Sequence, residues 1–71
     1  MTFAICIDNE GYEASLELRK IYQVVPLEPN DPKGYIRIVD ESGEDYLYDT
    51  KAFEAVDLPP RIERKLIATL S

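Results

Sequence analysis

The stretch that decides the fold is YIRIVDESGEDYLYDTKAFEAV, residues 35–56. In it Ser42-Gly43 separates two runs rich in β-branched and aromatic residues, a pattern that predicts a β-hairpin with a two-residue turn. Residues 49–52 predict a single helical turn, and Phe53 and Val56 predict a closing strand that returns to the core. A hairpin, a short turn and a strand in one uninterrupted run favour a small β-barrel.

A two-residue turn at Ser42-Gly43 fixes the pairing of the hairpin by subtraction. Ile38 is then opposite Leu47, and these residues belong to the core face together with Ile36. The other face is aromatic and cationic, with Arg37 opposite Tyr48 and able to lie across its ring. A slip of one residue would exchange the two faces. The predicted partner-binding surface is this second face, with its residues Tyr35, Arg37, Tyr46 and Tyr48.

The segments before the hairpin carry weaker signals. Residues 2–8 are apolar on both sides, which predicts a strand covered on both faces and makes Cys6 a small buried hydrophobe. Residues 12–20 contain good helix formers but also a period of two, and we interpret them as an irregular or extended arm. Residues 20–25 predict a strand because β-branched side chains suit a pleated sheet. Three prolines make residues 26–33 a loop.

The C-terminal segment has helical spacing. Ile62, Leu66 and Leu70 recur every four residues, Ile67 widens the apolar stripe, and Pro60 suits a first helical turn, so we expect a helix from about Pro60 to Leu70. Residues 58–71 hold three basic side chains and one acidic one, a charge of +2 against −8 for residues 1–57. An eleven-residue helix is marginal alone and needs a docking surface. Three alternatives are an open end of the barrel, a second copy in a homodimer, or another protein.

The order of these elements resembles the SH3-like barrels. More narrowly, DESGEDYLY (residues 40–48) followed by Phe53 and Val56 is similar to a set of short bacterial proteins of unknown function with SH3-like folds, best over residues 20–58. The resemblance implies a mainly β domain: a small SH3-like barrel of about five strands at residues 1–57, with a C-terminal α-helix at residues 58–71 packed on it. In those proteins a proline often follows the hairpin tyrosine, where this chain has Asp49.

By analogy with peptide-binding SH3 domains, which dock proline-rich ligands on an aromatic face, the resemblance makes Tyr46 and Tyr48 candidate contacts. Such grooves in eukaryotic-type domains rely on a tryptophan near the hairpin. This chain has no tryptophan, and Tyr35 is a partial substitute.

Composition argues against several functional classes. The chain has 71 residues, enough for one domain, and a net charge of −6, which opposes the phosphate contacts of nucleic-acid binding. It has no histidine, so it lacks an imidazole base and the usual zinc ligand. The acidic cluster of Asp40, Glu41, Glu44 and Asp45, with Asp49 beyond it, does not have calcium-loop spacing and is interpreted as a solvated hairpin tip. We therefore expect no enzyme activity, no catalytic residues, no cofactor and no metal.

The sequence favours a non-enzymatic protein-interaction module that binds a protein or peptide through the tyrosine-rich hairpin face. The alternative is an acidic regulator or antitoxin-like inhibitor of a basic partner. A third hypothesis, a nucleic-acid-associated SH3-like module, is opposed by the charge. The lone Cys6 and the absence of a signal peptide or membrane span indicate a cytoplasmic address.

Overall fold

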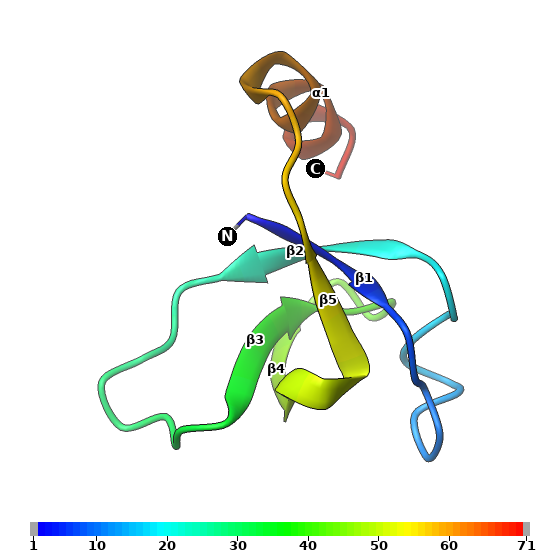
Figure 1. Ribbon diagram of the computed structural model, residues 1–71, viewed down its shortest axis with the longest axis vertical. Coiled ribbons are helices and arrows are strands. Elements are labelled where there is room, and N and C mark those ends of the chain that lie inside the picture. Colours follow the sequence, from blue (N-terminus) through cyan, green and yellow to red (C-terminus); the bar gives the residue numbers. More distant parts are fainter. Residues whose placement is uncertain (1, 71) are drawn as a thin grey trace.

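The computed structural model describes residues 2–70. It is mainly β, as predicted, with five antiparallel strands in one sheet and a C-terminal helix (Figure 1). The elements in chain order are β1 (Phe3–Cys6), β2 (Ile21–Val25), β3 (Tyr35–Val39), β4 (Asp45–Asp49), a 3-10 turn η1 (Thr50–Ala52), β5 (Phe53–Val56) and α1 (Pro60–Leu70). The predicted strand before the proline loop, the single turn after the hairpin and the bounds of the helix are all confirmed.

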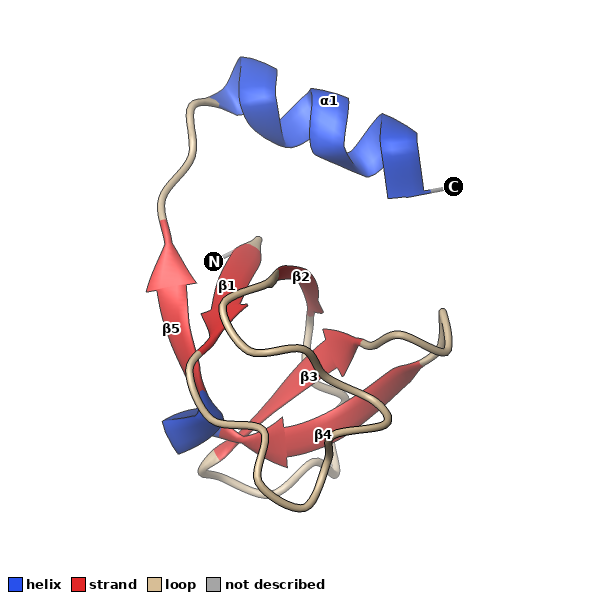
Figure 2. Cartoon of the chain, turned by 90° about the vertical axis from the view of Figure 1, so that its right-hand side faces the viewer, coloured by secondary structure: helices blue, strands red, loops and turns tan. Residues whose placement is uncertain are grey.

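The strand order is β4-β3-β2-β1-β5, with β2 at the centre. The first part of β2 pairs with β1 and its last two residues pair with β3, so one strand joins two halves of the sheet that lie at a steep angle (Figure 2). Within residues 2–70 the sheet is not closed, because β4 and β5 stand at its two ends without pairing to each other. The prediction of a mainly β fold is confirmed at this level.

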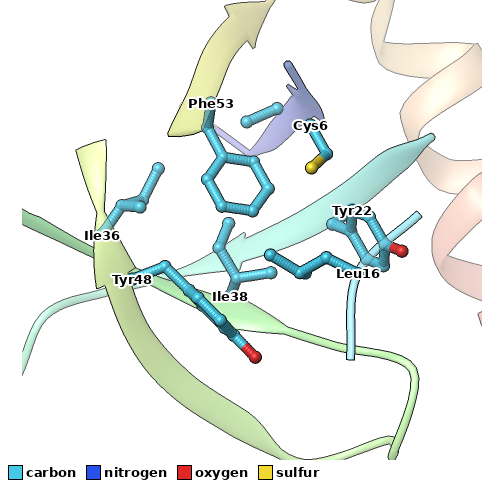
Figure 3. Close-up of a cluster of buried hydrophobic side chains, with 8 residues drawn as sticks. Cys6, Leu16, Tyr22, Ile36, Ile38, Tyr48 and Phe53 are labelled. Atoms are coloured by element: carbon cyan, nitrogen blue, oxygen red, sulfur yellow. The ribbon is translucent and has the colours of Figure 1, made fainter. Parts of the chain in front are cut away.

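The core lies between the two halves of the sheet. Cys6 and Leu16 are fully buried there, and the remaining members of the cluster are Ala4, Tyr22, Ile36, Ile38, Tyr48 and Phe53 (Figure 3). The prediction that Cys6 is a buried small hydrophobe is confirmed. Leu16 comes from the irregular arm, and full burial of a leucine contributes roughly 1.5–3 kcal/mol. The arm is therefore part of the folded unit.

The arm predicted at residues 12–20 is irregular, as expected, and the whole segment of residues 7–20 contains only turns and unpaired backbone. Its first turn is closed by a 2.7 Å bond from the Tyr12 amide to the Asn9 carbonyl, and the next turn by bonds from the amides of Ser15 and Leu16 to the Tyr12 carbonyl, both 2.9 Å long. Its middle is fixed to the hairpin by a 3.0 Å bond from the Glu41 amide to the Ser15 carbonyl. These bonds place Tyr12 and Ser15 beside the β3-β4 hairpin.

The predicted register of the hairpin is wrong by one residue. Ile38 pairs with Tyr46 and Ile36 with Tyr48, so these tyrosines belong to the core face, while Leu47 pairs with Arg37 on the other face. The reason is the turn, which has three residues. The Asp40 amide bonds to the Glu44 carbonyl and the Gly43 amide to the Asp40 carbonyl, each at 3.0 Å, and Gly43 has φ +83°. A type I turn followed by a left-handed residue is the usual form of such a loop.

Helix α1 lies over the outer face of β1 and β2, on the side away from the core (Figure 2). The Phe3 side chain projects from the face of β1 opposite Ala4 and Cys6, next to its pairing partners Gln23 and Val56. It is only 2 % exposed. Val56 is half-buried on this outer side, so of the two residues predicted to return to the core only Phe53 joins the main cluster. The main core and this outer layer thus share β1.

The apolar stripe of α1 is only partly covered. Ile62 and Leu66 are half-buried, whereas Ile67 is 43 % exposed. The side chain of Leu70, which the sequence places in the same stripe, lies outside the described part of the structure. No helix within residues 2–70 has the length and apolarity that crossing a membrane requires.

Candidate functional site

A buried pair of side chains lies at the base of the hairpin turn. The Tyr48 hydroxyl donates a 2.6 Å hydrogen bond to Oδ2 of Asp40, and the two residues are 4 % and 7 % exposed. Oδ1 of Asp40 accepts from the Ser42 amide at 2.9 Å and from the Ser42 hydroxyl at 2.5 Å. For Asp40 the prediction of a solvated tip is therefore wrong, because its carboxylate replaces water with three protein donors.

The protonation of this pair is fixed at neutral pH. Burial alone would raise the pKa of Asp40, but the hydrogen bonds from Ser42 and Tyr48 outweigh it and lower that pKa below its usual range. Burial, and next the bond to Asp40, raise the pKa of Tyr48 to about 12. The carboxylate accepts and the phenol donates over the whole range near neutrality, so the contact is a stable base for the surface above it.

An aromatic groove is built on this pair. Tyr12, from the arm, meets the Tyr48 ring edge-on, with centroids 5.1 Å apart and planes at 81°. Tyr46 projects from the same face of β4 as Tyr48, two residues earlier. The groove has a volume of about 450 Å³ and is lined by Tyr12, Ser15, Asp40, Ser42, Tyr46, Leu47 and Tyr48; we call it the tyrosine groove. Tyr12 and Tyr46 are 51 % and 49 % exposed.

Tyr35 and Arg37 lie elsewhere. They alternate with Ile36 and Ile38 along β3 and therefore project from the face opposite Tyr46 and Tyr48. Both line a second groove of about 590 Å³ beside the proline loop, with Val24, Val25, Pro26, Leu27 and Thr50 among its other walls. The prediction that the four residues share one face is wrong, since the one-residue shift in register divides them into two pairs.

Arg37 is engaged in ion pairs. Its guanidinium binds both oxygens of Asp31, with contacts of 2.8–3.1 Å, and reaches Asp45 at 3.0 Å. These hydrogen bonds, above all those from Arg37, lower the pKa of Asp31. Asp31 also accepts from the Glu28 amide at 2.7 Å. Residues 26–33 form an irregular loop, as predicted, and Arg37 connects this loop to the hairpin. Its guanidinium is therefore engaged within the chain and does not serve as an anchor for a partner.

The sequence did not identify Tyr12 as a site residue. Tyr12 follows the turn glycine Gly11 in a segment without regular pairing, so no strand or helix period indicates which way its side chain points. The only signal is its aromatic character within a turn, where a large side chain without a core position is a candidate contact. Its place opposite Tyr48 depends on the backbone bond between Ser15 and Glu41.

A second tyrosine network fixes the other side of the arm. The Tyr22 hydroxyl donates to Glu41 at 2.5 Å and accepts from the Glu17 amide at 2.7 Å. Lys20 Nζ contacts the same Glu41 oxygen at 2.6 Å. The hydrogen bonds from Lys20 and then Tyr22 lower the pKa of Glu41. Tyr22 is buried, so this network positions the arm and the hairpin turn rather than offering a binding surface.

Among residues 2–70 no three or more cysteine, aspartate or glutamate side chains are grouped so as to hold a metal ion. Comparisons of the chain with protein-family models, with curated proteins and with solved structures gave no match.

Proposed function

We propose that this chain is a non-enzymatic protein-interaction module that binds an extended peptide segment through the tyrosine groove. The observation that carries the proposal is the placement of two half-exposed tyrosines, Tyr12 and Tyr46, around the buried and hydrogen-bonded Tyr48. Tyrosine offers a large, rigid contact area at a small cost in conformational entropy, and it is enriched among the residues that dominate binding energy.

An SH3-like fold is part of the proposal. Its support is the order of the elements: an irregular arm after β1, a proline loop after β2, a tight hairpin and the one-turn η1 before β5. This is the order on which the resemblance in the sequence rests. Peptide-binding SH3 domains dock proline-rich segments, which keep a preformed extended conformation, on aromatic surfaces. The fold alone does not define a ligand, and the support for peptide binding is the tyrosine groove.

The charge around the groove defines the proposed ligand further. Tyr46 donates a 2.7 Å hydrogen bond to the exposed Glu44, which places one carboxylate beside the groove, whereas Asp45 projects from the opposite face and is paired with Arg37. The wider domain is acidic, with −8 over residues 1–57. A proline-containing peptide with lysine or arginine beside its apolar residues is complementary to this surface, because opposite potentials speed encounter and disfavour acidic competitors.

The test is selection of binders from a displayed library of short peptides, followed by measurement of their affinity for variants of the protein. We expect proline-containing basic peptides whose affinity falls at least about tenfold, equivalent to 1.4 kcal/mol, with Tyr46→Ala or Tyr12→Ala. Tyr35→Ala is the matched control, since Tyr35 has similar exposure and lies on the opposite face of the same hairpin. Selected peptides that depend on Tyr35 and not on Tyr46 would refute the assignment.

A second candidate is an acidic regulator of a basic partner. It is favoured by the exposed Glu44 at the hairpin turn together with the charge of residues 1–57. The two candidates differ in salt dependence. Screening lengths fall from about 10 Å at 0.1 M salt to about 3 Å at 1 M, so binding by charge alone should disappear over this range. Binding anchored by the tyrosines should weaken but persist.

A further inference from the structure

Strand β4 is an open edge of the sheet. It stands at one end of the strand order, and within residues 2–70 it pairs with β3 alone. Just beyond this pairing the Thr50 amide bonds to the Gly34 carbonyl at 3.1 Å. Hydrogen-bonded pairs alternate along an antiparallel ladder, so Tyr46 and Tyr48 bond to β3 while Leu47, between them, directs its N–H and C=O away from the sheet. No backbone bond from another described segment reaches Leu47.

The free edge of β4 borders the tyrosine groove. Leu47 lines this groove although its side chain projects from the face of β4 opposite Tyr46 and Tyr48. The groove is therefore bordered by the outward backbone of β4 as well as by Tyr12 and Ser15 of the arm. An unpaired strand edge is a template for another extended chain, because such a chain offers donors and acceptors at the same spacing.

The edge at β5 is less suited to pairing. The Ile7 amide bonds to the Ala52 carbonyl at 2.8 Å next to the β1-β5 ladder, so by the same alternation Phe53 and Ala55 direct their backbone groups outward. The Phe53 amide is already bonded to the Thr50 carbonyl at the end of η1. The outward donor that remains on β5 belongs to Ala55, whereas β4 presents outward groups at alternate residues along its length.

We propose that the peptide bound by the tyrosine groove adds an antiparallel strand to the sheet at the edge of β4. The inference rests on the proposed function and specifies its ligand as an extended segment held by backbone hydrogen bonds to Leu47. An extended strand repeats every two residues, about 6.8 Å, which matches the outward groups of β4. A polyproline II helix repeats every three residues, about 9.3 Å, and does not match them.

The two sides of the added strand differ in their tolerance of proline. Residues opposite Tyr46 and Tyr48 direct their side chains into the groove and belong to pairs without hydrogen bonds, so their N–H groups are not needed. Proline is suitable there, because its ring packs on aromatic side chains. The residue opposite Leu47 donates to β4, and proline is excluded from that position. Prolines in the bound segment should therefore be two or four residues apart.

The first test uses a synthetic copy of the tightest peptide from the library selection and a series of analogues, each with one backbone amide N-methylated. N-methylation removes one donor and keeps the side chain. We expect the affinity of the wild-type chain to fall at least about tenfold for methylation at every second residue of the paired segment, and less than about threefold at the residues between them, which are the matched controls.

The outcomes separate strand addition from the proposed function. Peptides whose affinity depends on Tyr46, but which have prolines three residues apart and no alternating sensitivity to N-methylation, overturn strand addition and leave the proposed function intact. Failure to select any peptide overturns both.

The second test locates the added strand on the protein by amide hydrogen exchange. In the free chain the Leu47 amide should exchange faster than those of Tyr46 and Tyr48, because it has no partner strand. Saturation with the same peptide should slow exchange at Leu47 at least about tenfold and leave Ala55, on the edge of β5, unchanged. Unchanged exchange at Leu47 in the saturated complex, or slowing at Ala55 instead, overturns the proposal.

Discussion

Tyr48 and Asp40, eight residues apart on the two sides of the hairpin turn, are joined by a 2.6 Å hydrogen bond from phenol to carboxylate. The bond closes the base of the three-residue turn. It also fixes the position of the Tyr48 ring, against which Tyr12 packs. Hairpin stability and the shape of the tyrosine groove therefore depend on the same contact.

Removing the Tyr48 hydroxyl should destabilise the domain. Tyr48→Phe keeps the ring in the core but leaves a buried carboxylate with one donor fewer, and we expect the free energy of unfolding to fall by roughly 1.5–3 kcal/mol. Urea unfolding followed by circular dichroism measures this. Tyr46→Phe is the control, because that hydroxyl bonds to an exposed glutamate, and its effect should stay within about 0.5 kcal/mol. Equal effects of the two variants would contradict the account.

Stability should decrease in acid. The hydrogen bonds from Ser42 and Tyr48 overcome the effect of burial and lower the pKa of Asp40, and those from Lys20 and Tyr22 lower the pKa of Glu41. The folded state thus binds protons less readily than the unfolded state, so this contribution is complete above the ordinary carboxyl pKa of about 4 and is lost as pH falls further. Urea midpoints measured between pH 7 and pH 2 should show the loss, and Asp40→Asn should make the decline shallower. A profile that is unchanged by Asp40→Asn would show that Asp40 has no role in it.

Alkaline pH should also weaken the fold. Burial raises the pKa of Tyr48 to about 12 and is likewise the main cause of a raised pKa for Tyr22. Both phenols hold their protons more tightly when folded, so their contribution is complete below the ordinary tyrosine pKa of about 10 and is lost as pH rises beyond it. Tyrosinate absorbance of the folded protein should therefore still increase well above the ordinary tyrosine pKa, because the buried pair ionises late. A single titration near pH 10 in the folded protein would contradict the burial of these hydroxyls.

The conformation of the hairpin turn should require glycine at position 43. Its φ of +83° is costly for any residue with a Cβ, and Gly43→Ala should lower the free energy of unfolding by about 1–2 kcal/mol although nothing lies within 4 Å of the added atom. Gly43→Asn should cost less, because asparagine tolerates this conformation. Urea unfolding of both variants measures the difference, and an alanine variant as stable as wild type would show that the turn has another conformation.

Arg37 should hold the loop of residues 26–33 in its ordered conformation. Arg37→Lys keeps the charge but loses the paired contacts to Asp31, because an ammonium group cannot reproduce a planar bidentate geometry. We expect faster amide hydrogen exchange at Glu28 and Asp31, measured by nuclear magnetic resonance, with little change in β1 or β5. Lys51→Arg, at an exposed position of η1, is the control. Unchanged exchange in the loop would mean that the proline-rich segment is fixed without Arg37.

The sequence allowed most of the fold to be predicted, because each element depends on local chemistry. Prolines set the loop of residues 26–33, a capping Asp49 introduces η1, and the spacing of Ile62 and Leu66 defines α1. The register failed by one residue at the turn. Asp40 at the first position and Gly43 at the fourth is a pattern typical of a type I turn, and it competes with the two-residue turn at Ser42-Gly43.

The candidate site was harder to predict, because it depends on contacts between segments that are far apart in the sequence. The one-residue shift moved Tyr48 into the core and separated Tyr35 and Arg37 from the other two residues. Tyr12 reaches the groove only because the arm is bonded to the hairpin turn, a contact between segments about 26 residues apart that no local pattern encodes. Burial of Asp40 likewise depends on the position of the Tyr48 hydroxyl.

The most direct test of the tyrosine groove is a map of amide chemical shifts during titration with a selected proline-containing basic peptide. The account predicts that the largest changes fall on Tyr12, Ser15 and Tyr46, and that they disappear in a folded Tyr46→Ala variant but remain in Tyr35→Ala. Changes centred instead on Leu27 and Tyr35, at the second groove, would contradict the central claim.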